Sequence, residues 1–166
     1  MSERRKKLNE TESKALLAAF RIPIAQTVVA RSASEAMVPA AEIGLPVVLK
    51  IDSPSIVHKS DVGGVRLNLR SLAAVRSTYQ EILDEVKRVQ PDAVINGIAI
   101  EPMIQKRNGR ELVVGVTRDP VFGPVITFGA GGTMIELIDD RAMELPPLNL
   151  FLARRLIERA RVAETL

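Results

Sequence analysis

Three strand patterns follow one another after Pro91, and no helical pattern separates them: 97–104, 112–117 and 124–128. Two short polar turns, 106–109 and 118–120, divide these patterns. Strands joined by short turns pair antiparallel, because a parallel neighbour needs a crossover of a dozen or more residues. We therefore expect an α+β fold in which at least part of the sheet is antiparallel, and not a doubly wound one.

Helix signals precede and follow these strands. Asn9 and Glu12 form a capping signature, and Ser32 with Glu35 repeats it before Gly44. Ser71 opens a long amphipathic pattern, with apolar residues spaced for one helical face. The expected helices are 9–20, 32–43, 71–90 and one from 149 to the last residues; the expected earlier strands are 27–30, 46–51 and 65–69.

The charge of the chain is concentrated at its start. Residues 1–7 hold four basic side chains and one acidic one, which accounts for the whole net charge of +3. The rest is formally neutral, so we expect a solvated tail and no nucleic-acid partner.

The sequence has no cysteine, and no apolar run approaches the length of a membrane span. We expect a cytoplasmic protein without a membrane partner.

Lys50 ends a buried strand pattern, and a polar loop leads from it to the glycine pair Gly63 and Gly64. A fixed lysine and backbone N–H groups exposed by glycine suit a polyphosphate. A plain hairpin turn beneath a lysine that reaches water explains the same spacing, and both interpretations stay open on spacing alone. The loop 129–132 (GAGG) is equally ambiguous between ligand approach and a tight turn, and Met134 breaks a dinucleotide fingerprint.

His58 is the only histidine, and it stands beside Lys59 in that polar loop. A lone histidine is usually structural or exposed, but an imidazole near neutral pH is also a competent nucleophile toward phosphorus. Several acids follow the strands, and carboxylates near phosphates usually indicate Mg²⁺.

Taken together, six segments resemble one family: 46–50, 55–65, 101–104, 111–116, 118–124 and 128–132. It is the nucleotide-binding β subunit, or fused β-like domain, of ADP-forming acetyl- and acyl-CoA synthetases, relatives of succinyl-CoA synthetase. The resemblance implies an ATP-grasp fold, with two α+β lobes and a largely antiparallel sheet. One lobe would comprise about 9–45 plus 105–166 and the other about 46–104, after a basic disordered tail, 1–8. The family's Asn-Pro-Leu strand is missing before Leu166, which implies a C-terminally truncated domain that is inactive alone.

The resemblance also implies roles for particular residues. His58 would relay a phosphoryl group between nucleotide and a histidine of a CoA-binding α subunit or domain. Lys50 would contact the phosphates, Gly63 and Gly64 would cover them, and 101–104 would be the hinge for adenine. The implied nucleotide-binding residues are Lys50, Lys59, Gly63, Gly64, Val65, Glu101, Pro102, Met103, Ile104 and Glu111. Lys14 resembles the early lysine of many ATP-grasp proteins.

The implied cofactors are ATP or ADP and Mg²⁺, with Glu136 and Asp139 as metal ligands. The implied function is phosphoryl transfer between ATP or ADP and an acyl phosphate, in an acid–thiol ligase with a possible homo-oligomeric state. The alternative is a ligand-sensing regulatory domain of a fused protein acetyltransferase. The presence of His58 favours the ligase, because a sensing module needs no phosphoryl acceptor.

Overall fold

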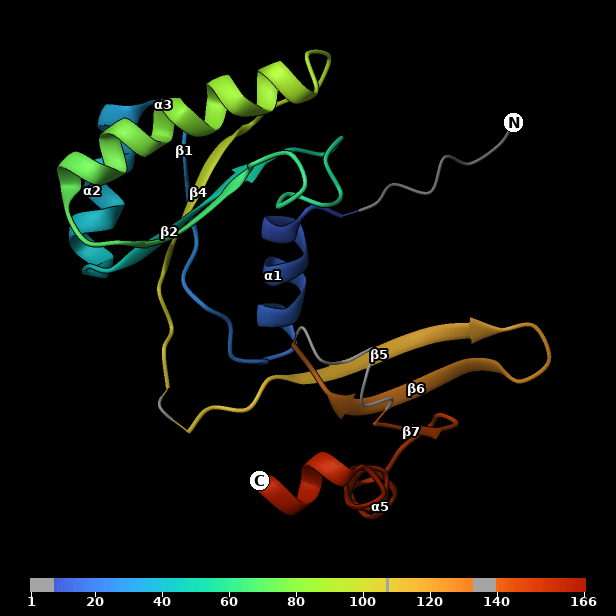
Figure 1. Ribbon diagram of the computed structural model, residues 1–166. Coiled ribbons are helices and arrows are strands. Elements are labelled where there is room, and N and C mark those ends of the chain that lie inside the picture. Colours follow the sequence, from blue (N-terminus) through green and yellow to red (C-terminus); the bar gives the residue numbers. More distant parts are fainter. Residues whose placement is uncertain (1–7, 107, 133–139) are drawn as a thin grey trace. The chain divides into compact units, whose positions relative to one another are not determined.

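The computed structural model describes residues 8–106, 108–132 and 140–166. It divides into two compact units, Met1–Ile104 and Gln105–Leu166 (Figure 1). In the described part of the chain, no helix has both the length and the apolar character that crossing a bilayer requires.

The first unit is built on a four-stranded sheet in which every pairing is antiparallel. This confirms the expected α+β class. The order across the sheet is β1 (Val28–Ala30), β4 (Gly97–Pro102), β2 (Val47–Asp52) and β3 (Val65–Leu69).

Two helices, α2 (Ala33–Ile43) and α3 (Leu72–Val89), form a single core with this sheet (Figure 1). Alternate residues of β2, namely Val47, Leu49 and Ile51, are fully buried in that core. Because side chains alternate across a strand, the side chain of Lys50 lies on the opposite face of the sheet. The pleat thus places the core residues of β2 on one face of the sheet and Lys50 on the other.

Helix α1 (Glu10–Ala19) starts with the predicted capping box. The Asn9 side chain accepts from the Glu12 N–H at 2.7 Å, and the Glu12 carboxylate accepts from the Asn9 N–H at 3.0 Å. Ser32 and Ser71 cap α2 and α3 in the expected manner. Unlike those helices, α1 buries none of its residues.

The second unit is a three-stranded antiparallel sheet in the order β5 (Leu112–Asp119), β6 (Gly123–Ala130) and β7 (Arg141–Glu144). Helix α5 (Leu150–Glu158) and a short 3₁₀ helix, η1 (Arg161–Thr165), complete it. Its small core consists of Phe128, Ala142, Leu156 and Ala160. Strand β7 is absent from the sequence predictions.

The prediction of one continuous C-terminal helix is wrong. Helix α5 ends at Glu158, and Ala160 takes an extended backbone conformation before η1. The buried carboxylate of Asp140 accepts the N–H groups of Arg161 at 2.7 Å and Val162 at 2.8 Å. This cap, formed by a residue distant in sequence, redirects the chain.

The structure also differs from the expected grouping of 9–45 with 105–166. Strand β1 pairs with β4 along three residues, and α2 shares its core with α3, so residues 28–43 pack with 46–104. The two units divide between Ile104 and Gln105. How the expected two-lobed arrangement forms around a ligand stays a prediction.

Candidate functional site

Two predicted site residues, Lys50 and Glu101, come together on the face of the sheet away from α2 and α3. Lys50 pairs with Ala99 and Val48 pairs with Glu101 in the antiparallel register of β2 and β4. The two side chains are therefore diagonal neighbours on one face. Lys50 Nζ donates to Glu101 Oε2 at 2.9 Å, and the side chain of Glu101 is only 7% exposed.

Helix α1 adds two charged groups to this pair. Lys14 Nζ donates to Glu101 Oε1 at 2.6 Å and to Thr27 Oγ1 at 2.8 Å. The Thr27 hydroxyl itself donates to the same Glu101 oxygen at 3.1 Å. A buried carboxylate needs such partners, because burial without them is costly. Glu101 is thus the centre that holds Lys14 and Lys50 in place.

Glu10 forms the second centre of the cluster. Its carboxylate accepts from Lys50 Nζ at 2.9 Å and from Lys59 Nζ, and Lys14 Nζ lies 3.4 Å away. Burial raises the pKa of Glu10, but the hydrogen bonds and charges of Lys59 and Lys50 outweigh it and hold the pKa well below its usual range. For Lys50, burial lowers the pKa, whereas hydrogen bonds to Glu10 and Glu101 raise it to a net value above normal.

The loop from Ser53 to Gly64 carries His58 and is fastened at its beginning. The buried Ser53 hydroxyl donates to the Val94 carbonyl at 2.6 Å, and the Val94 N–H donates to the Ser55 hydroxyl at 2.9 Å. Ile56 is buried in the main core. These contacts fix the first residues of the loop, and the more exposed residues from Val57 onward follow.

The glycine pair closes the loop, but its backbone groups are already engaged. The N–H of Gly63 donates to the Ser60 carbonyl at 3.1 Å, and that of Gly64 donates to the Lys59 carbonyl at 2.7 Å. A Cβ at Gly64 would lie 2.5 Å from Ile51 Cγ2, and Gly63 has a φ of +67°. In this conformation the glycines shape the loop, so contact of their N–H groups with phosphate stays a prediction.

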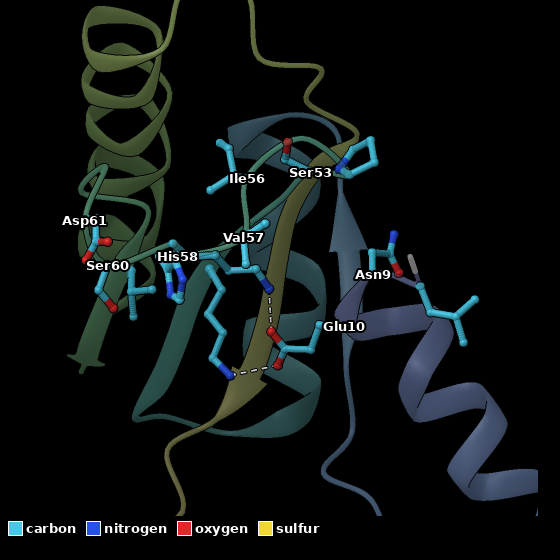
Figure 2. A pocket seen from close by; sticks show the side chains of 13 residues that line it. Asn9, Glu10, Ser53, Ile56, Val57, His58, Ser60 and Asp61 are labelled. Carbon is cyan, nitrogen blue, oxygen red and sulfur yellow. Dashed lines mark hydrogen bonds and ion pairs between the residues drawn. The ribbon is translucent and has the colours of Figure 1, made fainter. Parts of the chain in front are cut away.

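A cavity of about 610 Å³ lies between the start of α1 and this loop (Figure 2). Figure 2 shows Asn9 and Glu10 on one side and His58, Ser60 and Asp61 on the other. Lys50, Lys59 and Val65 also line it, so the newly found Glu10 shares this cavity with four predicted site residues, His58 among them. Its size is typical of sites for small ligands. His58 is exposed at this cavity.

The predicted adenine hinge, Glu101 to Ile104, ends the first unit. Pro102 and Met103 are half-buried, and Ile104 is exposed. The Met103 N–H donates to the Pro46 carbonyl at 3.0 Å. The Met103 N–H is therefore already engaged, and contact of this segment with adenine stays a prediction.

Glu111 belongs to the second unit, next to the second glycine loop. Its carbonyl accepts from the Gly131 N–H at 2.7 Å, and a Cβ at Gly132 would lie 2.6 Å from its Oε2. The predicted metal ligands Glu136 and Asp139 lie outside the described residues. Within the described residues, no group of three His, Cys, Asp or Glu side chains is arranged to hold a metal ion.

Sequence reasoning missed Glu10 and Thr27 as parts of the site. Glu10 and Lys14 are four residues apart on one helix, a spacing that places both on one face. That spacing usually means no more than an exposed helical ion pair. The structure shows that this pair belongs to the site, because Lys14 contacts Glu101 and Glu10 contacts Lys50.

The antiparallel α+β unit places lysines and a glycine-closed loop at one cavity, an arrangement that suits an anionic ligand. The ATP-grasp domain model matches residues 1–166, and the chain belongs to the ATP-grasp family, which binds nucleotides. The sequence is 40% identical over 141 residues to the β subunit of acetate–CoA ligase [ADP-forming] I of Pyrococcus furiosus. That match covers 85% of this chain and 60% of the subunit.

Solved structures of a second relative, the dinucleotide forming acetyl-coenzyme A synthetase 1 of Ca. Korarchaeum cryptofilum, also match. Its complex with coenzyme A, Ca-AMPCP and HgCl⁺ superimposes with a TM-score of 0.90 at 44% identity and covers 98% of this chain and 70% of that one. Its complex with coenzyme A and Mg-AMPPCP has a TM-score of 0.79 at 38% identity, with 98% and 68% covered; there the phosphohistidine segment points towards the nucleotide binding site. The chain thus spans 60% to 70% of the length of these relatives.

Proposed function

We propose that this chain is the nucleotide-binding part of an ADP-forming acyl-CoA ligase that passes a phosphoryl group through His58. The observation that carries the proposal is the position of His58, exposed at the cavity that Lys50 and Lys59 also line. The relatives that match are ADP-forming ligases, and this supports the ligase over the regulatory alternative, which no comparison favours.

In the direction of ATP synthesis, acyl-CoA and phosphate give an acyl phosphate and free CoA. A histidine of the CoA-binding partner then takes the phosphoryl group, and the carboxylate is released. An imidazole nitrogen of His58 attacks the phosphorus of that phosphohistidine, and the partner's imidazole leaves. Finally, a β-phosphate oxygen of ADP attacks phosphorus and His58 leaves, which yields ATP.

The residues of this chain contribute positioning and charge neutralisation. Lys50, fixed by Glu101, is expected to donate to the nucleotide phosphates, and Lys59 stands next to the phosphohistidine position. Mg²⁺, when bound, would neutralise negative charge on the phosphates. Mg²⁺ takes only one or two protein carboxylates beside phosphate and water, so Glu136 and Asp139 suffice as proposed ligands.

The test is transfer of label from [γ-³²P]ATP to the full-length protein in the presence of Mg²⁺. We expect an acid-labile adduct in the wild type that His58→Ala abolishes. Ser60→Ala, in the same loop, is the matched control and should keep the label. If the label survives His58→Ala, the relay role is wrong.

A further inference from the structure

Glu10 stands where an anionic ligand of the two lysines would stand. Its carboxylate bridges Lys50 Nζ, at 2.9 Å, on the sheet and Lys59 Nζ on the His58 loop. The dashed lines at Glu10 in Figure 2 mark these two contacts. The side chains of Lys50 and Lys59 are 26% and 16% exposed, so little solvent screens these contacts. A carboxylate and a phosphate both accept charge-assisted hydrogen bonds from an ammonium group.

Helix α1 carries Glu10 without being locked by an apolar core. None of its residues is buried, and Leu16, Leu17 and Phe20 are 51%, 42% and 75% exposed. The ion pairs of Glu10 and Lys14 tie it to the sheet. Exchange of the Glu10 contacts therefore requires no disruption of the hydrophobic core.

We propose that Glu10 is an intramolecular competitor of the nucleotide phosphates, which neutralises Lys50 and Lys59 in the free protein and withdraws from them when ATP binds. The inference rests on the proposed function and adds a residue that sets nucleotide affinity. A polyphosphate bound to both ammonium groups would place further negative charge beside the Glu10 carboxylate, and this repulsion disfavours sharing of the two lysines. Lys14, 3.4 Å from Glu10 and one helical turn along α1, is the partner that remains for the released carboxylate.

The experiment measures ATP affinity by calorimetry with Mg²⁺ for the full-length wild type and Glu10→Gln. Glutamine keeps the shape of the side chain and removes its charge. We expect ATP to bind about fivefold to tenfold more tightly, as for loss of a partly buried competing ion pair. Adenosine, which has no phosphate, should bind both proteins equally. Glu42→Gln, which removes an exposed carboxylate from α2, should leave both affinities unchanged.

The outcomes separate this role from a purely structural one. Weaker or unchanged ATP binding in Glu10→Gln overturns the proposal, because Glu10 would then order the lysines for the ligand or be irrelevant. An equal gain for adenosine also overturns it, since the change would not act through phosphate. Glu10→Asp should restore nearly wild-type affinity, and Glu10→Ala gives the same test if the glutamine variant fails to fold. A wild type that does not bind ATP would instead refute the proposed function.

Discussion

Replacement of Lys50 by methionine removes one charge and leaves a side chain of similar volume. In the structure, Lys50 Nζ lies 2.9 Å from both Glu10 Oε1 and Glu101 Oε2. The question for stability is whether either carboxylate is left without a partner. Removing one member of a buried ion pair costs about 3–5 kcal/mol when the remaining charge is uncompensated.

Both carboxylates keep other partners in this variant. Glu101 keeps Lys14 at 2.6 Å and the Thr27 hydroxyl at 3.1 Å, and Glu10 keeps Lys59. We therefore expect Lys50→Met to lower the free energy of unfolding by only about 1–2 kcal/mol. Loss of a charge-assisted contact to phosphate is worth about 1.5–3 kcal/mol, so the Kd for ATP should rise by roughly 10- to 150-fold.

Urea unfolding and calorimetry with ATP and Mg²⁺ measure these two effects separately. Lys87→Met, which removes an exposed lysine from α3, is the control for the change in net charge. An unchanged Kd in Lys50→Met would refute the phosphate contact. A stability loss of about 3–5 kcal/mol would refute the reasoning that Lys14 and Thr27 suffice for Glu101.

Three further predictions concern local packing and pH. Gly64→Ala should lower the free energy of unfolding by about 1–3 kcal/mol in urea titrations. The reason is that its Cβ would lie 2.5 Å from Ile51 Cγ2 and 2.9 Å from the Lys59 carbonyl. A variant as stable as the wild type would contradict the close packing of the loop. Asp140→Ala should speed amide hydrogen exchange at Arg161 and Val162, whose N–H groups lose their acceptor, and unchanged exchange would show that η1 needs no cap. The folded-state pKa of Glu10 lies below its ordinary value of 4.5, so its contribution to stability is complete above that pH and declines as the pH falls below it. Glu10→Gln should lose less stability at low pH, which urea titrations at a series of pH values measure. If the free energy of unfolding falls equally with pH in the two proteins, the lowered pKa of Glu10 is contradicted.

Much of the first unit follows from local sequence signals. The Asn9 capping box, the Ser32 and Ser71 caps and the strand pattern after Pro46 each act over a few residues, and the structure confirms each. Strand β7 escaped prediction because its four residues, RAME, have little strand character of their own and depend on pairing with β6. The end of α5 escaped for a similar reason, because its cap comes from Asp140.

The candidate site shows the same division between local and distant causes. The alternation of β2 indicates that Lys50 leaves the core, and the family resemblance indicates what it would bind. Glu10 could not be found in this way, since its role depends on contacts with Lys50 and Lys59, 40 and 49 residues away. Local patterns therefore identify groups that can bind a ligand, but not the groups that oppose its binding.

The charges of the cluster explain why such an opposing group is needed. Lys14, Lys50 and Lys59 would repel one another in the free protein if they faced only Glu101. Glu10 supplies the second negative charge from a helix that buries none of its residues. A bound polyphosphate supplies more negative charge than Glu10 does, so it can take over the same lysines. The site is thereby stable without nucleotide, at the cost of some nucleotide affinity, and the Glu10 variants measure that cost directly.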